Sequence, residues 1–250
     1  MFDRYYHYPA SARSASSYDD PAAGDTFADV MATLSPSAWW RLGESSGASA
    51  VDEMATQNGV YDGTITYSVA GITTDGDTAI GLDGAGSVEI ADNAAWDFGT
   101  SDFTCMIGLD LGAWRSADRS QLICRGDGAG IGFYWRLDTT TNRVAIRVGY
   151  EEVFSTGIPT LAGTGWHLLG LRCDRSGNAY LNIDGVDEAA VDISGAAAES
   201  IERSDALYLG KRVSSGFDDD FLYDATIDEA AVWNGTLLTE ADFATLYGAL

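Results

Sequence analysis

Two adjacent acids, Asp228 and Glu229, stand near the end of the chain in the stretch TIDEAAVW, which otherwise is typical of a buried strand. Alternation along a strand places Asp228 on one face and Glu229 on the other, and both faces are largely apolar. An unpaired carboxylate in such surroundings is costly, so each acid requires a cation or several hydrogen-bond donors. The sequence therefore predicts that this pair binds an ion or accepts a set of hydrogen bonds.

Histidine and cysteine do not indicate a catalytic or metal centre. His7 and His167 are the only histidines, and the three cysteines lie singly in strand-like runs, at Cys105, Cys124 and Cys173. No Cys/His cluster has the spacing of a zinc site, and single buried thiols are common core residues. Spacing alone does not exclude a triad assembled in space. We nevertheless expect a protein that is not an enzyme.

Composition predicts one acidic domain. The chain has 250 residues, 46% of them apolar, which is enough for one large core. With 14 basic and 38 acidic residues the formal charge is -24, and such a surface repels nucleic-acid phosphates and anionic membranes. No run approaches the roughly 18 apolar residues of a membrane span, and the N-terminus lacks the order of a secretory signal. We expect neither nucleic acid nor membrane as a partner.

The chain divides near residue 25. Residues 1–25 have no apolar period and predict an extended arm, whose rings at Phe2, Tyr5, Tyr6 and Tyr8 suit contact with another chain. Alternatively, the arm packs along its own domain. Residues 26–250 form the second unit, with helices expected at 26–34, capped by Asp25 or Thr26, and at 239–248, capped by Thr239 with Asp242 as capping-box partner. Between the helices, short strands recur every 8 to 12 residues or so, which is typical of an all-β sandwich or barrel.

Several stretches in this order resemble the concanavalin A-like, laminin G-like jelly rolls. They are SPSAWWRLGESSGASAVDEMATQNGVYDG, GDTAIGLDGAGSVEIADNAAWDFGTSDFTCMIGLDL, GWHLLGLRCDRSGNAYLNIDG, LYLGKR and TIDEAAVWNGTLLTEADFATLY. The resemblance covers about residues 34–250 and implies a two-sheet antiparallel jelly-roll sandwich, one sheet concave and one convex. It implies little about activity, because this fold carries many functions.

The resemblance also implies a structural calcium ion. In similar jelly rolls the acid of the Asp-Glu pair binds calcium together with oxygens of the N-terminal loop, which here is GASAVDEMATQNG. Carried over to this sequence, the ligands are Asp52, Asn58 and Asp228, an oxygen set of the kind that calcium requires.

A glycan is the ligand that the resemblance suggests. Sugar rings stack on aromatic side chains, and the aromatic residues in or beside the expected concave sheet are Trp114, Tyr134, Trp135 and Tyr150. Glucanases on this fold carry two catalytic carboxylates in a Glu-x-Asp-x-x-Glu strand motif, which this sequence lacks.

The same resemblance suggests a place for the protein. Jelly rolls without a signal or catalytic carboxylates occur on tailed-phage virions, so we expect a capsid decoration or tail component at the virion surface. It would dock on other virion proteins through its arm, be oligomeric within that assembly and bind host surface glycans. The alternatives are an extracellular carbohydrate-binding or adhesion module of a bacterium or archaeon, and a divergent glycoside hydrolase.

Overall fold

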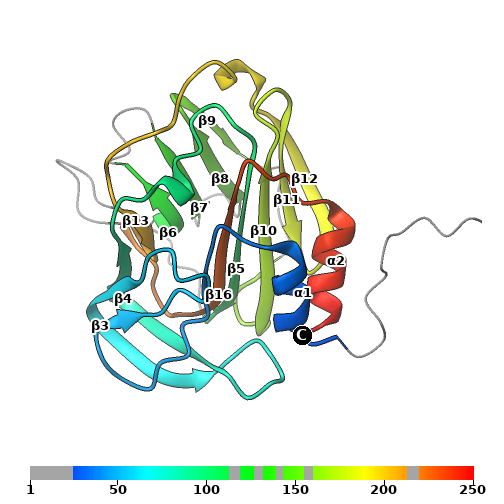
Figure 1. Ribbon diagram of the computed structural model, residues 1–250. Coiled ribbons are helices and arrows are strands. Elements are labelled where there is room, and N and C mark those ends of the chain that lie inside the picture. Colours follow the sequence, from blue (N-terminus) through cyan, green and yellow to red (C-terminus); the bar gives the residue numbers. More distant parts are fainter. Residues whose placement is uncertain (1–24, 113–118, 127–131, 139–142, 155–159, 213–219) are drawn as a thin grey trace, which may run out of the picture.

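The computed structural model describes residues 25–112, 119–126, 132–138, 143–154, 160–212 and 220–250. Trp114 and the arm residues Phe2, Tyr5, Tyr6 and Tyr8 lie outside the described residues, so the predictions made for them are untested. In the described part, strands dominate and two short α-helices accompany them (Figure 1).

The helices lie near the two ends of the described chain. They are α1 (Phe27–Leu34) and α2 (Glu240–Gly248), with two 3-10 turns, η1 (Ala94–Trp96) and η2 (Ser194–Ala196). The strands are β1 (Ala38–Trp40), β2 (Ser49–Ala50), β3 (Gly59–Ala70), β4 (Thr78–Ile90), β5 (Phe103–Leu111), β6 (Arg119–Arg125), β7 (Phe133–Asp138), β8 (Arg143–Val148), β9 (Glu151–Phe154), β10 (Trp166–Cys173), β11 (Asn178–Ile183), β12 (Val186–Asp192), β13 (Leu207–Leu209), β14 (Lys211–Arg212), β15 (Asp220–Phe221) and β16 (Ala225–Asn234).

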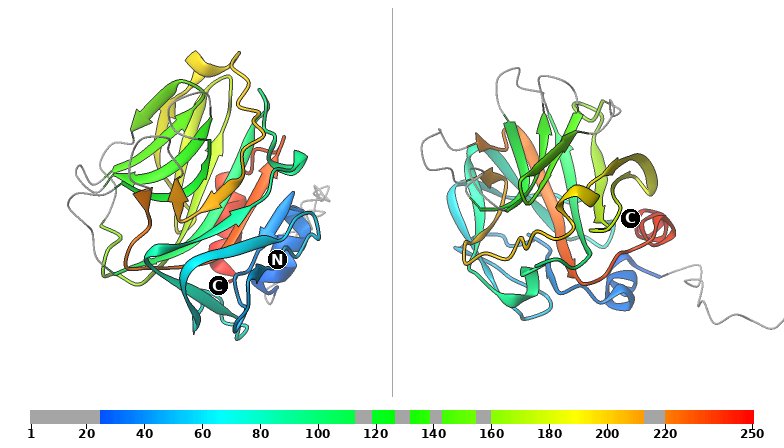
Figure 2. Two further views of the ribbon diagram at one scale, coloured as in Figure 1. Left: turned by 90° about the vertical axis from the view of Figure 1, so that its left-hand side faces the viewer. Right: turned by 90° about the horizontal axis from the view of Figure 1, so that it is seen from above.

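The long strand β4 joins two antiparallel layers. Its first half pairs with β16, where Ile80 opposes Ile227, and its second half pairs with β13, where Val88 opposes Leu209. The ladder runs β12-β11-β10-β5-β16-β4-β13-β6-β7-β8-β9, with β1 on β16 and with β3 and β2 beside β4. The ladder folds over at β4, so that two layers face each other, as Figure 2 shows. This arrangement confirms the predicted jelly-roll sandwich.

The core lies between the two layers. Alternate residues of β5, such as Ile107 and Leu109, are fully buried in the same apolar cluster as Trp135 of β7 and Ile146 of β8. Burial of this apolar area is the main force that holds the layers together. It also fixes which side chains of each strand point away from the core, because successive residues alternate between the faces.

The two predicted helices are confirmed, and both begin at a capping box. The hydroxyls of Thr26 and Thr239 each accept a hydrogen bond from the backbone N–H of the third helical residue, and the carboxylates of Asp29 and Asp242 accept one from the backbone of the cap. The helices pack together over one end of the outer face of the layer that contains β10, β5 and β16. There Phe243 and Met31 share an apolar cluster that includes Met106 and Leu168. Within the described residues, no helix has the length and apolar character needed to span a bilayer.

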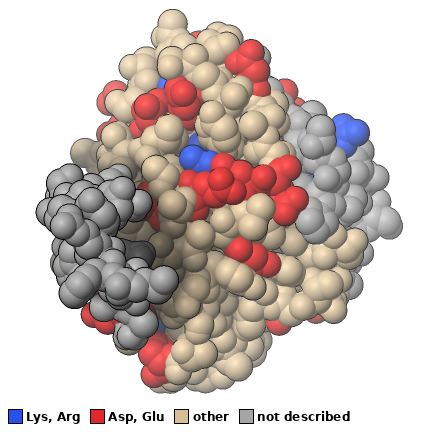
Figure 3. All heavy atoms as spheres, turned by 90° about the vertical axis from the view of Figure 1, so that its right-hand side faces the viewer, with Lys and Arg blue, Asp and Glu red and all other residues tan. Residues whose placement is uncertain are grey.

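Acidic side chains gather on the face that bears α2 and β12, with little positive charge among them (Figure 3). Glu188 of β12 and Glu240 of α2 belong to these elements. The strand β12 ends the ladder, and charges on such an edge disfavour pairing with the strand of another molecule.

Candidate functional site

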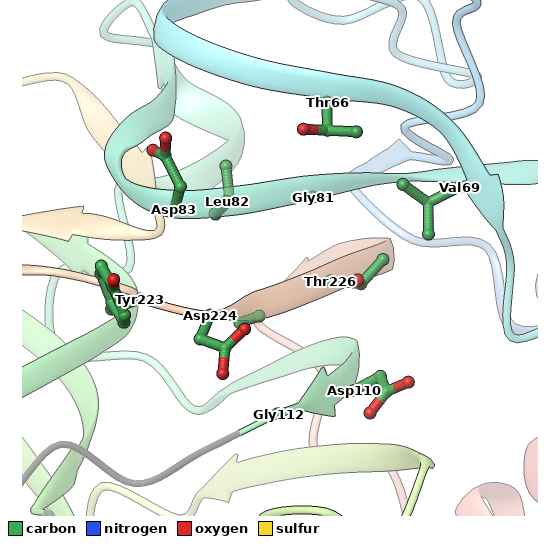
Figure 4. Close-up of a pocket in the computed structure, with 11 residues that line it drawn as sticks. Thr66, Val69, Gly81, Leu82, Asp83, Asp110, Gly112, Tyr223, Asp224 and Thr226 are labelled. Atoms are coloured by element: carbon green, nitrogen blue, oxygen red, sulfur yellow. The ribbon is translucent and has the colours of Figure 1, made fainter.

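A groove of about 500 Å³ opens on the outer face of the layer that contains β10, β5 and β16 (Figure 4). It combines carboxylates, hydroxyls and one aromatic ring, and its lining residues are Thr66, Val69, Gly81, Leu82, Asp83, Asp110, Gly112, Tyr223, Asp224, Ala225 and Thr226. Figure 4 shows Tyr223 at one end of the groove and Val69 at the other.

Strand register brings these residues together from distant parts of the chain. Thr66 of β3 opposes Gly81 of β4, Gly81 opposes Thr226 of β16, and Thr226 opposes Asp110 of β5. Residues directly opposed in antiparallel strands place their side chains on one face. The row continues to the half-buried Trp166 of β10, which opposes Asp110. The residues next to Asp110 and Thr226 in the chain, among them Leu109 and Ile227, point into the core.

Three glycines shape the groove. At Gly81 a Cβ atom would lie 3.2 Å from Cβ of Thr66, so the missing side chain leaves the floor open. At Gly84, which has φ +91°, a Cβ atom would lie 2.3 Å from the Tyr223 ring, so the ring packs directly on the backbone. At Gly112 a Cβ atom would lie 2.6 Å from Oδ2 of Asp224. The positions of Tyr223 and Asp224 thus depend on glycine.

The groove can bind hydrogen-bond donors. The carboxylates of Asp110 and Asp224 have no hydrogen-bond or ion-pair partner among the described residues, and that of Asp83 accepts only the backbone N–H of Ala85, at 3.1 Å. Their oxygens are therefore available as acceptors, the Thr226 hydroxyl can donate or accept, and the Tyr223 ring offers an apolar face.

Tyr134, Trp135 and Tyr150, the predicted aromatic residues that the structure describes, do not form one stacking surface. Trp135 is fully buried in the core, so its ring is not available to a ligand, while Tyr134 points to the other face of β7 and is 3% exposed. Tyr150, between β8 and β9, is 61% exposed, and its backbone N–H donates to Oε2 of Glu199 at 2.9 Å. The groove residues were not among those singled out from the sequence.

The acids of the Asp-Glu pair lie at a bulge in β16 and are both fully buried. Glu229 accepts hydrogen bonds from Nε1 of Trp39 at 2.5 Å and from Nε of Arg41 at 3.0 Å. Asp228 accepts backbone N–H groups of Ile72 and Glu229. Asp77 completes the cluster, because carboxylate oxygens of all three acids lie within 4.8 Å of one another. The pair thus connects the N-terminal strand β1 to β16.

Burial favours the protonated form of the two acids in this cluster. Removal from water, and then the charge of Glu229, raise the pKa of Asp228 to about 8, and burial raises the pKa of Glu229 to about 7 although Arg41 opposes the shift. Oδ2 of Asp77 is buried without a hydrogen bond, 2.9 Å from Nε of Arg41. When the three acids are deprotonated, the guanidinium of Arg41 does not balance their charge, and a calcium ion would do so; Asp77 is not among the predicted ligands, and calcium binding at Asp228 stays a prediction.

The side-chain oxygens of Asp52 and Asn58 accept hydrogen bonds from backbone N–H groups, whereas the calcium prediction uses them as metal ligands. The oxygens of Asp52 accept four backbone N–H groups, from Trp39, Met54, Thr56 and Gln57, at 2.9–3.0 Å. Oδ1 of Asn58 accepts the N–H of Asp52 at 3.0 Å. These bonds use the acceptor capacity of the Asp52 carboxylate, so Asp52 closes the loop, while Asp77 is the acid that lies beside Asp228. Calcium binding by Asp52, Asn58 and Asp228 stays a prediction.

No protein-family model matches the sequence, and no curated protein matches it. Solved structures do match. The binding domain of botulinum neurotoxin DC, in complex with rat synaptotagmin II, has a TM-score of 0.63 and 12% identity over 86% of this chain and 51% of that chain. Domain 4 of AbnA, a GH43 extracellular arabinanase from Geobacillus stearothermophilus, in complex with arabinotriose, has a TM-score of 0.62 and 16% identity over 85% of this chain and 98% of that chain.

A structure of botulinum neurotoxin type C, whose cell entry depends on two ganglioside molecules, matches with a TM-score of 0.65 and 11% identity over 84% of this chain and 50% of that chain. This chain thus spans about half the length of the neurotoxin chains and nearly all of the arabinanase domain. Identities of this size show a shared fold alone. The β-sandwich predicted from the sequence is confirmed.

Proposed function

We propose that this chain is a non-catalytic glycan-binding module and that the groove is its saccharide site. The observation that carries the proposal is the combination, in one groove, of the Tyr223 ring with the available carboxylates of Asp110 and Asp224. Sugars present an apolar face beside hydroxyl donors, and that pattern complements an aromatic ring beside acceptors. The arabinanase domain, which was solved with arabinotriose, supports the proposal by the common fold.

The charge of the groove selects a neutral saccharide. Asp83, Asp110 and Asp224 line one groove, its described lining residues include no lysine or arginine, and the chain carries a formal charge of -24. A sialylated or uronic glycan would bring another negative charge into this field. Neutral hydroxyls donate to the carboxylates without that repulsion, and hydrogen bonds to charged acceptors are among the stronger ones.

Filling the groove is the first test. We expect Gly81→Val to abolish binding of the neutral oligosaccharides that a glycan array selects, because the new side chain occupies the floor between Thr66 and Val69. Asp224→Asn should weaken binding roughly tenfold, since one charge-assisted hydrogen bond becomes a neutral one. Titration calorimetry measures both effects, and melting curves show that the variants are folded.

Glu188→Gln is the matched control, because it removes one negative charge from the edge strand β12, outside the groove. It should bind as the unaltered protein does. Full affinity in Gly81→Val, or equal losses in Asp224→Asn and Glu188→Gln, would exclude the groove as the saccharide site. Hydrolysis of the bound saccharide would favour the divergent glycoside hydrolase instead.

We further propose that the module is displayed on a virion and docks through residues 1–25. The support is the resemblance to virion jelly rolls and the tyrosine-rich composition of the arm. A chain without residues 1–25 should keep the melting temperature of its jelly roll and be missing from purified particles, as mass spectrometry would show. Incorporation of the shortened chain at full occupancy would refute docking through the arm. A polysaccharide or secretion locus beside the gene would favour the extracellular module.

A further inference from the structure

A tryptophan beside the groove lacks the contacts of a core residue. Trp166, the first residue of β10, is half-buried and belongs to neither of the two apolar clusters. Within the described part of the chain, its ring stacks on no other aromatic ring and its indole Nε1 has no hydrogen-bond partner. A tryptophan that packs in a core usually has its N–H paired. The exposed part of the Trp166 ring and its N–H are therefore available to a molecule outside the chain.

Register and alternation both place Trp166 on the face that carries the groove. Trp166 opposes Asp110, which lines the groove, and directly opposed residues of antiparallel strands share a face. Two residues further along β10, Leu168 lies in the apolar cluster under the helices on the outer face, whereas Leu169 lies in the core. In Figure 4, Asp110 and Thr226 lie on neighbouring strands at the border of the groove. The indole thus follows Asp110 as the next outward side chain in this row.

Side-chain contacts fix the start of β10, where Trp166 lies. Nδ1 of His167 lies 2.7 Å from Oδ2 of Asp184, and Nε2 lies 2.8 Å from the hydroxyl of Thr164. The N–H of Leu168 donates to Oδ1 of Asp184 at 2.9 Å. These contacts join the loop before β10 to the turn after β11. A side chain on a backbone that is already fixed loses less freedom when a ligand binds, which favours Trp166 as a ligand contact.

The distance between the groove floor and Trp166 sets the length of the ligand. Gly81 on β4 and Trp166 on β10 are separated by β16 and β5, so three strand spacings of about 4.8 Å give about 14 Å between them. Between the two lie the Thr226 hydroxyl and the Asp110 carboxylate, which are polar partners for sugar hydroxyls. One sugar ring is too short to reach from the floor to the indole. A linear oligosaccharide that crosses the strands contacts both.

We propose that Trp166 is a second stacking position of the saccharide site and that the site therefore selects linear neutral oligosaccharides over monosaccharides. One sugar unit lies in the groove, the chain passes Asp110, and a later unit stacks on the indole, whose Nε1 donates to a sugar hydroxyl. An indole offers sugars an apolar face beside a donor, whereas the groove offers acceptors. This inference rests on the proposed function of the groove and adds to it a specificity for chain length.

Titration calorimetry with size series of arabinose, glucose, galactose and mannose oligomers, each of one to six units, tests the inference. In a series that the unaltered protein binds, affinity should increase with the number of units. Trp166→Ala should weaken binding of the hexamer about three- to tenfold, because one stacking contact is lost, and this loss should shrink as the oligomer is shortened. Tyr247→Ala, which removes an exposed aromatic ring on α2, is the matched control and should bind as the unaltered protein does.

The outcomes separate this inference from the proposed function. If Trp166→Ala binds every oligomer as the unaltered protein does while Gly81→Val binds none, the groove is a saccharide site that ends at Asp110 and the inference is wrong. If the unaltered protein binds no oligomer, or Gly81→Val keeps full affinity, the proposed function itself fails.

NMR tests the contact without relying on the fold of Trp166→Ala. The indole N–H signal of Trp166 is assigned by its absence from the spectrum of Trp166→Phe. It should shift when the unaltered protein is saturated with the hexamer that it binds, and Trp166→Phe, which keeps an aromatic face, should lose less affinity than Trp166→Ala. An unshifted Trp166 signal would contradict stacking on this residue.

Discussion

Replacing Glu229 with alanine should lower the free energy of unfolding by about 1–3 kcal/mol, because it leaves the buried Nε1 of Trp39 without an acceptor and removes one of the three carboxylates that Arg41 contacts. Arg41 would lose the carboxylate at 3.0 Å, and Nε1 of Trp39 would lose its acceptor. Both partners belong to the N-terminal part of the domain, so the connection between β1 and β16 weakens. Denaturant unfolding measures the change.

Two further variants serve as controls for that result. Glu229→Gln keeps an acceptor for Trp39 and should recover part of the loss, while Glu188→Ala, on the edge strand β12, should change stability by less than about 0.5 kcal/mol. Equal effects of Glu229→Ala and Glu188→Ala would show that Glu229 carries no structural connection.

In chelator, the unaltered protein should lose stability relative to Asp228→Asn as the pH rises from about 4 to 8. The pKa of Asp228 is raised to about 8 in the folded chain from 3.8, so between these values the folded state holds a proton that the unfolded state has released. Stability from this group is therefore complete at low pH and is lost with rising pH, by on the order of 5 kcal/mol. Because asparagine does not titrate, the comparison with Asp228→Asn isolates the proton of Asp228 together with its coupling to Glu229.

Calcium reverses this dependence if it binds at the cluster. Metal ions bind carboxylates in their deprotonated form, so excess calcium should stabilise the unaltered protein increasingly as pH rises and should not affect Asp228→Asn. Identical melting curves in calcium and in chelator at pH 8 would exclude calcium from the cluster, and a flat pH dependence in chelator would contradict the shifted pKa.

Local patterns predicted the helices well. The sequences beginning at Thr26 and Thr239 place an acid three residues after a hydroxyl cap, and both capping boxes form. These contacts span three residues, so no distant part of the chain has to be known.

Strand boundaries were less predictable. The stretch AIGLDGAGSVEIAD contains an Asp-Gly turn signal at Asp83 and Gly84, yet the single strand β4 runs through it, with Gly84 at φ +91°. The sequence VDEAAVD forms the edge strand β12. Its alternation of exposed and half-buried residues reflects a position at the end of the ladder, which only long-range pairing determines.

The groove could not be predicted, because its register is non-local. Thr66, Asp110 and Thr226 meet only once β3, β4, β16 and β5 are aligned. Alternation did contain a partial indication, since Asp110 and Thr226 each stand between apolar residues that face the core. The same alternation separates Tyr134 from Trp135, so these neighbours were never able to line one surface.

A crystal structure of the protein with the neutral oligosaccharide selected on the array would decide whether the groove is a saccharide site. We predict a sugar ring in the groove, packed against Tyr223, with hydroxyls donating to Asp110 and Asp224. A saccharide bound instead beside Tyr150, or a groove without saccharide at a concentration that saturates binding in solution, would contradict the proposed function.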